Sequence, residues 1–171
     1  MSTAAESSPA FSTCDLCDVH KADTDGAFRV LPPVFHSYGG RARFCGPVVT
    51  VKCFEDNTPV KAALESPGDG RVLVVDGAGS LRRALVGGNI AASAAKNGWA
   101  GVVVDGAVRD QAELAAADVG LRALALMPLP TERKAPGQTG IAVQIQGVWV
   151  RPGDWLYADA DGIVVMPPPA G

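Results

Sequence analysis

Short apolar runs alternate with segments of helical character through the middle of the chain. The clearest runs lie in 71–79 and 101–110, and each ends in a polar turn. Between them, the alanine-rich segment 89–98 closes on Asn97-Gly98, a pair typical of a helix C-terminus. Strand, helix and strand in this order predict a parallel βαβ unit with a right-handed crossover.

Similar signals extend this unit on both sides. Thr58 followed by Pro59 is typical of a helix start, with a capping residue and then a first-turn proline. Thr13 is interpreted as the cap of a short N-terminal helix. We expect helices from Thr13 to about Lys21, from Thr58 to near Ser66 and over residues 111–120. We expect strands over residues 47–54 and 121–128.

The C-terminal third has a different pattern. Residues 141–150 alternate in period two, with aliphatic side chains on one face and Gln144 and Gln146 on the other. This pattern predicts one antiparallel strand with a solvated side. Residues 155–167 predict a hairpin that turns at Asp161-Gly162.

The expected fold class is therefore α/β, with a mixed sheet that is parallel in its centre and antiparallel towards the C-terminus. We expect one compact domain over residues 13–166, between flexible tails at 1–12 and 167–171. The length of 171 residues and the 47% of apolar residues are typical of one globular domain.

The charge and the apolar runs exclude some function classes. A net charge of -3 disfavours a nucleic-acid partner, because phosphate backbones usually require a basic face. No apolar run approaches the roughly 20 residues of a membrane span. The N-terminus lacks the cationic and apolar regions of a signal peptide. We expect a cytoplasmic protein without a membrane partner.

The four cysteines are interpreted as structural thiols. Cys14 and Cys17 form a C-x-x-C pair, but a zinc site needs a second pair or histidines at ligand spacing, and the sequence offers neither. A redox role is disfavoured because Asp15 and Asp18 beside the pair raise the pKa of a thiol.

Three further motifs have structural interpretations. The glycine turn at 77–80 invites a dinucleotide or methyl-donor interpretation, but Arg82 occupies the position of the third small residue, so a tight turn or a pocket edge is favoured. The acidic segment 158–162 lacks both the earlier ligand and the final glutamate of a calcium loop and is interpreted as a hairpin turn. Lys52 could form a Schiff base, but it is interpreted as a surface lysine on a strand.

One constellation predicts chemistry. Arg109-Asp110 ends one strand, and the alanine-rich helix opens with Gly87-Gly88-Asn89-Ile90. In a parallel sheet both segments lie at the carboxyl edge, where ligands bind. A helix N-terminus receives an anion, an arginine grips a carboxylate, and a carboxylate suits Mg²⁺. The residues predict a small carboxylate held against a metal; the alternative is a buried Arg–Asp pair that fixes a loop.

Four blocks of the sequence match a known family in order. The blocks are GGRARFCGPVVTVKCFEDN, RVLVVDGAGSLRRALVGGNIA, NGWAGVVVDGAVRD and PGDWLYADADGIVV, and they resemble the RraA-like family from about Thr13 to Met166. This family contains regulators of ribonuclease activity and metal-dependent 4-hydroxy-4-methyl-2-oxoglutarate aldolases. The resemblance implies a swivelling β/α fold in a trimeric ring, with active sites between subunits.

The resemblance also implies roles for the constellation. The segment from Gly87 to Ile90 contacts the pyruvate part of the substrate, Arg109 binds its carboxylate and keto group, and Asp110 holds Mg²⁺ or Mn²⁺. Aldolases of the family usually have G-D-x-L where this chain has Gly87-Gly88-Asn89-Ile90, so Gly88 replaces an acid that moves protons. The dedicated regulators often lose the aspartate that this chain keeps at Asp110.

We therefore expect a metal-dependent lyase that acts on 2-oxo acids through a pyruvate enolate. Its substrates would be 4-hydroxy-4-methyl-2-oxoglutarate, by aldol cleavage to pyruvate, and oxaloacetate, by decarboxylation. The missing acid at Gly88 predicts a bias towards decarboxylation, because only aldol cleavage needs a base at the substrate hydroxyl. The alternatives are a non-catalytic inhibitor that binds an endoribonuclease, and a trimeric scaffold.

Overall fold

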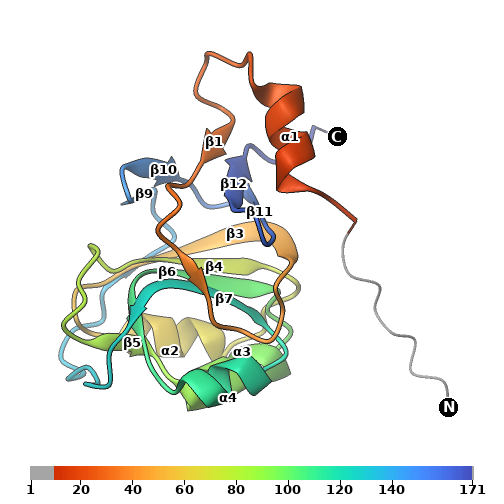
Figure 1. The fold of residues 1–171 in the computed structure, drawn as a ribbon. Coiled ribbons are helices and arrows are strands. Elements are labelled where there is room, and N and C mark those ends of the chain that lie inside the picture. The colour runs from red at the N-terminus through yellow and green to blue at the C-terminus, as the bar shows by residue number, and fades with distance from the viewer. Residues whose placement is uncertain (1–9, 171) are drawn as a thin grey trace, which may run out of the picture.

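A ten-stranded mixed sheet runs through residues 10–170, the part of the chain that the computed structural model describes (Figure 1). The helices are α1 (Thr13–His20), α2 (Thr58–Leu64), α3 (Gly88–Lys96) and α4 (Gln111–Ala116). Three of these four helices, α2, α3 and α4, lie against one face of the sheet. The strands are β1 (Arg29–Val30), β2 (His36–Ser37), β3 (Phe44–Lys52), β4 (Val72–Asp76), β5 (Ala84–Val86), β6 (Gly101–Val108), β7 (Gly120–Leu126), β8 (Gln138–Thr139), β9 (Val143–Ile145), β10 (Val148–Val150), β11 (Trp155–Ala158) and β12 (Ile163–Met166).

The centre of the sheet is parallel, as the βαβ pattern predicts. Strands β3, β4, β6 and β7 are neighbours in this order, and each pair is parallel. Strands β4 and β6 are buried at every position, because layers on both faces cover a parallel sheet. The short sequence V-V-D-G-A occurs twice, at 74–78 and 103–107, and the two copies lie side by side with Asp76 opposite Asp105.

Alternate side chains of these strands enter two different layers. On one face, Val75 and Val104 pack with Leu64, Ile90 and Leu114 from the helices α2, α3 and α4. On the other face, Val74 and Val103 pack with residues from the C-terminal strands, including Ile145 and Leu156. The central parallel strands of the sheet therefore separate a helical layer from an antiparallel β layer, which Figure 1 shows below and above them.

Both predicted helix caps differ in detail from the structure. The cap of α1 is Ser12, whose hydroxyl accepts a hydrogen bond from the backbone N–H of Asp15 at 3.3 Å. Thr13 instead donates its backbone N–H and its hydroxyl to Asp159, at 2.8 and 2.6 Å, because its side chain is buried against the β11–β12 turn. Helix α2 begins at Thr58 as predicted, but Asn57 holds its N-cap position.

The prediction of a single strand over 141–150 is wrong. The chain forms a tight hairpin of β9 and β10, turning at Gln146 and Gly147, which have φ values of 45° and 79°. The alternation holds inside β9, where Val143 and Ile145 are buried and Gln144 is exposed. The predicted hairpin at the C-terminus is confirmed, since β11 and β12 pair through Ala158 and Ile163.

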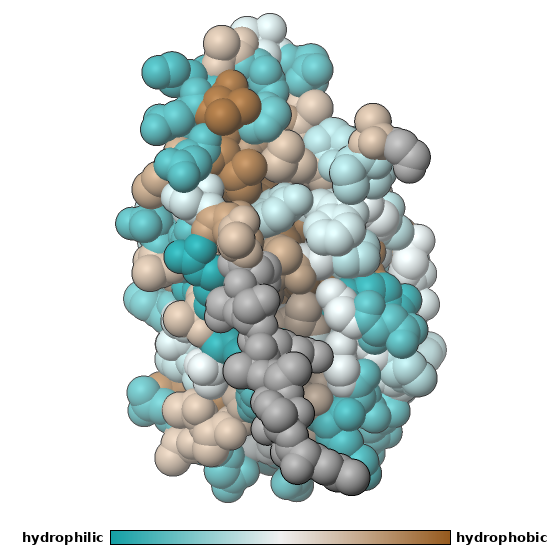
Figure 2. All heavy atoms as spheres, turned by 90° about the vertical axis from the view of Figure 1, so that its right-hand side faces the viewer, coloured by the Kyte–Doolittle hydropathy of each residue, from teal (hydrophilic) through white to brown (hydrophobic). Residues whose placement is uncertain are grey.

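The N-terminal segment lies on the β layer. The ring of Phe11 packs edge-on against Tyr157, with ring centroids 5.2 Å apart. Of the two predicted tails, residues 1–9 and 171 lie outside the described residues. Figure 2 shows the face that carries α1: polar side chains border it, and apolar atoms gather towards its upper end. Val19 of α1 is 75% exposed.

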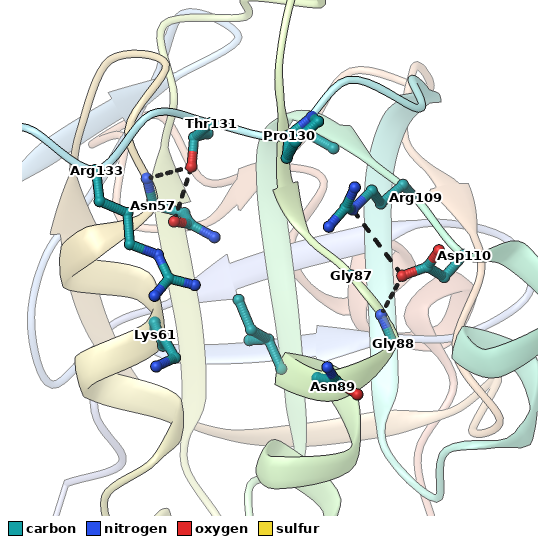
Figure 3. A pocket seen from close by; sticks show the side chains of 12 residues that line it. Asn57, Lys61, Gly87, Gly88, Asn89, Arg109, Asp110, Pro130, Thr131 and Arg133 are labelled. Atoms are coloured by element: carbon teal, nitrogen blue, oxygen red, sulfur yellow. Dashed lines mark hydrogen bonds and ion pairs between the residues drawn. The ribbon is translucent and has the colours of Figure 1, made fainter.

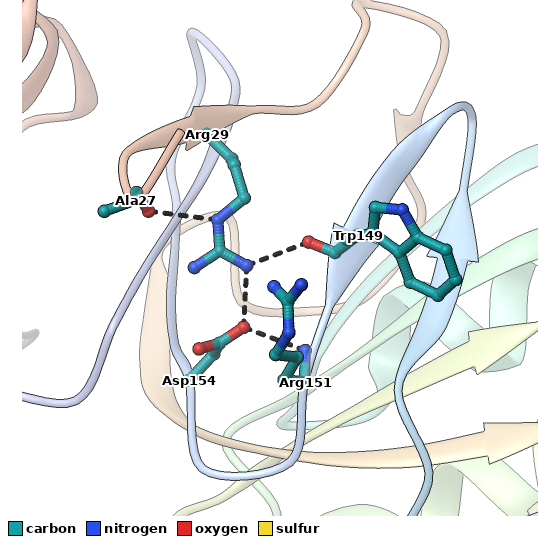
Figure 4. A network of polar contacts seen from close by, with 5 residues as sticks. All are labelled: Ala27, Arg29, Trp149, Arg151 and Asp154. Atoms are coloured by element: carbon teal, nitrogen blue, oxygen red, sulfur yellow. Dashed lines mark hydrogen bonds and ion pairs between the residues drawn. The ribbon is translucent and has the colours of Figure 1, made fainter. Parts of the chain in front are cut away.

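An ionic network holds the edge of the β layer (Figure 4). The guanidinium of Arg29 donates hydrogen bonds to the Asp154 carboxylate and to the carbonyl of Trp149, each at 2.8 Å. Asp154 also accepts the backbone N–H of Arg151 at 2.8 Å. These contacts fix β1 and β10 to the turn that precedes β11.

Within the described residues, no helix is long and apolar enough to cross a membrane.

Candidate functional site

A cavity of about 310 Å³ opens at the carboxyl edge of the parallel sheet (Figure 3). Two walls form it: the start of α3 with the end of β6, and α2 with the loop that follows β7. Its lining residues are Asn57, Lys61, Ala84, Gly87, Gly88, Asn89, Ile90, Arg109, Asp110, Pro130, Thr131 and Arg133. The structure therefore brings together all six residues of the constellation singled out in the sequence.

Arg109, Asp110 and the start of α3 make direct contact on one wall. The Asp110 carboxylate oxygen Oδ2 accepts a hydrogen bond from the backbone N–H of Gly88 at 2.9 Å. The same oxygen lies 4.0 Å from Nε of Arg109. The two side chains are 40% and 41% exposed, so the alternative of a buried pair that only fixes a loop does not describe them.

Local backbone geometry presents these groups to the cavity. Asp110 is the N-cap residue of α4 and has a φ of 67°, which turns its side chain back towards α3. A Cβ at Gly87 would lie 2.9 Å from the Asp110 carboxylate and 3.3 Å from Nε of Arg109. Glycine at position 87 therefore allows the backbone to approach this pair closely.

The first turn of α3 offers free donors beside the pair. The first intrahelical bond of α3 runs from the N–H of Ala91 to the carbonyl of Gly87. The N–H groups of Asn89 and Ile90 consequently have no acceptor within the helix. A helix N-terminus with free donors attracts an anion.

Glu113 was not predicted from the sequence as a residue of the site. A Cβ built on Gly88 would lie only 1.7 Å from Oε2 of Glu113, so the Glu113 carboxylate occupies the space that a side chain at position 88 would take. An acid is therefore present at this place, supplied by α4. The available signal was the spacing, since residues three apart, such as Asp110 and Glu113, share one side of a helix.

The opposite wall is held by hydrogen bonds between α2 and the loop after β7. The hydroxyl of Thr131 donates to the Asn57 side-chain carbonyl at 2.8 Å, and the Asn57 amide donates to the carbonyl of Leu85 at 3.1 Å. The Asp56 carboxylate accepts the backbone N–H groups of Lys134 and, at 2.7 Å, of Ala135. These bonds fix the loop that carries Arg133.

Asp56 has a strongly shifted pKa. Its burial would raise the pKa, but hydrogen bonds from Thr58, Lys134 and Ala135 outweigh burial and lower it to about 2. The carboxylate is thus charged at neutral pH and holds the loop through charge-assisted hydrogen bonds.

The donor set suits a hard divalent cation better than zinc. Among the described residues, no three histidine, cysteine or acidic side chains gather in a metal-binding cluster. Oδ1 of Asp110 accepts no hydrogen bond from the described residues, which leaves it available for a cation. Mg²⁺ keeps several waters and is often bound through one or two carboxylates, so Asp110, with Glu113 nearby, fits such an ion.

The other motifs of the sequence lie outside the cavity. The 77–80 turn leads from β4 towards β5 and does not open a helix, and Lys52 is an exposed residue of β3. All four cysteines are free thiols with raised pKa values; burial, followed by Asp56 and Asp76, raises that of Cys53 to about 12. For Cys14, which is exposed, Asp161 is the main cause of the rise, and Asp15 is not among the causes.

A second cavity of about 290 Å³ lies between β1 and the β9–β10 hairpin. It contains Arg29, which already pairs with Asp154, and none of its lining residues is acidic. It therefore lacks the paired acid and base of the first cavity.

Similar proteins from several bacteria are named as aldolases. A protein of Albidiferax ferrireducens, named as a proposed 4-hydroxy-4-methyl-2-oxoglutarate aldolase, is 68% identical over 92% of this chain and 95% of its own length. A relative in Cupriavidus necator with the same name is 54% identical over 90% of this chain and 93% of its own.

The solved structures carry other descriptions. The RNA-processing inhibitor RraA from Thermus thermophilus has a TM-score of 0.88 and 47% identity, covering 95% of this chain and 96% of its own. A protein of Geobacillus kaustophilus described as a 2-dimethylmenaquinone methyltransferase has a TM-score of 0.85 and 41% identity, covering 93% of this chain and 96% of its own.

The match to a protein family covers nearly the whole chain. Residues 13–165 match the RraA-like family, described as Aldolase/RraA. The fold, the order of the sequence blocks and these relatives agree, and the chain belongs to the RraA-like family.

Proposed function

We propose that this protein is a metal-dependent lyase that cleaves 4-hydroxy-4-methyl-2-oxoglutarate to pyruvate and decarboxylates oxaloacetate. The observation that carries the proposal is the contact of Arg109, Asp110 and Gly88 at the edge of one cavity, with the Glu113 carboxylate beside them. The aldolase names of the relatives from Albidiferax and Cupriavidus support the reaction class.

In this proposal, Arg109 and the start of α3 bind the 2-oxo acid end of the substrate. The guanidinium of Arg109 can donate to the substrate carboxylate and keto oxygen through its planar fork. The N–H groups of Asn89 and Ile90 add donors to the same anionic end. The substrate would thereby be oriented with its C3–C4 bond towards position 88, against which the Glu113 carboxylate lies.

Asp110 is the residue that would hold Mg²⁺ or Mn²⁺. The bound cation would supply Lewis-acid stabilisation of the negative charge that develops on the keto oxygen. Asp110 is kept in place by the Gly88 N–H, which leaves one carboxylate oxygen for the ion.

Glu113 is the candidate base for aldol cleavage. We propose that it removes the proton of the C4 hydroxyl as the C3–C4 bond breaks, so that C4 becomes the keto carbon of one pyruvate and the electron pair of the broken bond passes into the enolate of a second. Protonation of this enolate at C3 releases pyruvate. The glycine at position 88 would bias the enzyme towards decarboxylation only if no other acid replaced the missing one. Glu113 lies against position 88 and can act as that acid.

A second candidate function is inhibition of an endoribonuclease by surface contact. The observation that favours it is the 47% identity to the Thermus RNA-processing inhibitor over 95% of this chain. We do not propose methyl transfer, because the 77–80 turn leads towards a strand and lacks the helix N-terminus that a dinucleotide or methyl donor would need. We further propose that the protein works in the cytoplasm as a homotrimer with active sites between subunits.

The proposed function is tested by following pyruvate release from both substrates with chelator-treated protein, before and after addition of Mg²⁺. We expect release from both substrates only with the metal. Absence of pyruvate from both, together with inhibition of a purified endoribonuclease, would favour the second candidate.

A further inference from the structure

The cavity holds more positive charge than a simple 2-oxo acid requires. Its lining contains three cationic side chains, Lys61, Arg109 and Arg133, in a chain whose net charge is -3. The one acidic side chain in this lining, Asp110, would bind the divalent cation. Arg109 is then sufficient for a substrate with one carboxylate, and two cations remain.

The two remaining positively charged side chains, Lys61 and Arg133, lie on the wall opposite the proposed metal ligand, Asp110. Figure 3 shows Lys61 and Arg133 on the side of Asn57 and Thr131, across the cavity from Arg109 and Asp110. Lys61 comes from α2 and Arg133 from the loop after β7. A ligand that touches both walls must therefore carry an anionic group at each end.

Hydrogen bonds hold the loop that carries Arg133 in place on this wall. The loop is anchored on each side of Arg133, by Thr131 to Asn57 and by the N–H groups of Lys134 and Ala135 to Asp56. Neighbouring Glu132 pairs with Lys134, and no described residue bonds to the Arg133 guanidinium.

Lys61 is also available to a ligand. Its amino group lies 3.2 Å from the Glu65 carboxylate on the same helix, and the two side chains are 37% and 49% exposed. Exposed pairs of this kind are weak, so an anion held by two cations can replace the partner.

We propose that Lys61 and Arg133 form a subsite for the second carboxylate of the substrate, so that the enzyme selects 2-oxo acids with a carboxylate at each end. The inference rests on the proposed function. In 4-hydroxy-4-methyl-2-oxoglutarate this second carboxylate takes no part in the bond cleavage, so its binding to Lys61 and Arg133 positions the C3–C4 bond. In oxaloacetate it is the group that leaves as CO₂, so a grip on it gives no equal advantage.

The test compares a diacid with the matching monoacid. Pyruvate release is measured with Mg²⁺ from 4-hydroxy-4-methyl-2-oxoglutarate and from 4-hydroxy-4-methyl-2-oxopentanoate, which has a methyl group in place of the second carboxylate. The variants are Lys61→Gln, Arg133→Gln and the two combined. Each single change should lower kcat/KM for the diacid about tenfold, mainly through KM, and leave the monoacid within about twofold.

Three matched variants separate the subsite from general effects. Lys134→Gln removes a charge from the same loop, but its side chain pairs with Glu132 and does not line the cavity. Glu65→Gln removes the partner of Lys61 and keeps the lysine. Both should retain the preference for the diacid, and Arg133→Lys should retain most of it because the charge remains.

The outcomes distinguish this inference from the proposed function. Equal losses for diacid and monoacid, or an unchanged diacid rate in the double variant, would overturn the subsite while pyruvate formation upheld the lyase. If the unaltered protein releases no pyruvate from either compound, the proposed function fails, and the subsite fails with it.

Discussion

Gly88, which lines the cavity, and Glu113 of α4 compete for the same space. The Glu113 carboxylate lies where a side chain at position 88 would begin, only 1.7 Å from a Cβ built on Gly88. Glycine at position 88 therefore leaves room for an acid supplied by the neighbouring helix. Two residues 25 positions apart depend on each other, and neither can be interpreted alone.

This dependence predicts the result of moving the acid. Glu113→Gln should reduce aldol cleavage by about 10²–10⁴-fold, the usual value of general-base catalysis, and leave oxaloacetate decarboxylation within a few-fold. Gly88→Asp alone should destabilise the fold, because its side chain meets Glu113. Combining Gly88→Asp with Glu113→Ala should restore stability and part of the aldolase rate. If Glu113→Gln leaves aldol cleavage unchanged, another group supplies the base.

Arg109 is expected to act through the shape of its guanidinium. Arg109→Lys should be nearly as harmful to pyruvate release as Arg109→Ala, since a point charge cannot replace a planar fork that contacts two oxygens. A loss of about 100-fold in kcat/KM is expected for both variants. Near-normal activity of the lysine variant would show that charge alone is sufficient.

At the residue scale, the sequence predicts one wall of the cavity and misses the other. The sheet edge is where a predicted strand ends, at Arg109 and Asp110, and where a predicted helix begins, at 87–90. The place of these residues can therefore be inferred from the sequence. Lys61 and Arg133 become neighbours only because Asp56 and Asn57 anchor the loop after β7 to α2. Such long-range hydrogen bonds leave no local pattern in the sequence.

At the scale of elements, Asp56 is the main link between α2 and the loop that carries Arg133. The lowered pKa of Asp56, about 2, means that its charge contributes stability above its ordinary pKa near 4 and that this contribution is lost as the pH falls towards 2. Asp56→Asn should therefore cost about 2 kcal/mol at pH 7 and flatten the dependence of stability on pH in that window.

Urea unfolding of the unaltered protein and of Asp56→Asn, at several pH values between 7 and 2.5, measures this difference. Asp118→Asn is the control, because Asp118 is 78% exposed in a surface ion pair with Arg41 and should contribute little. An equal acid dependence in the unaltered protein and in Asp56→Asn would contradict the assignment.

The buried strands are the elements that the sequence predicts best. Strands β4 and β6 are apolar and fully buried, so hydrophobicity alone locates them. The β9–β10 hairpin was missed because the alternation of 141–150 continues through its turn. Gln146 adopts a positive φ there while its backbone and side-chain amides hydrogen-bond to Asp105, and this tertiary contact overrides the strand pattern.

At the scale of the whole molecule, the open rim of the cavity points to assembly. Arg109 and Asp110 are 40% and 41% exposed, whereas lyase chemistry benefits from a site that excludes water. A second copy packed against the rim would cover them. Sedimentation equilibrium should give three times the 17.5 kDa chain mass, and dilution below the dissociation range should lower activity. A monomer with full activity would exclude this assembly as a requirement.

In the proposed function, Asp110 holds a divalent cation that drives pyruvate formation. The most direct test measures pyruvate release from oxaloacetate by chelator-treated protein and by Asp110→Asn, with and without Mg²⁺ or Mn²⁺. The asparagine side chain can still accept the Gly88 N–H, so the fold of the wall should persist, but a neutral amide is a far weaker ligand. We predict no release without metal, recovery with metal, and none from Asp110→Asn under either condition. Metal-independent release, with a substrate adduct on Lys52 trapped by borohydride, would contradict the account.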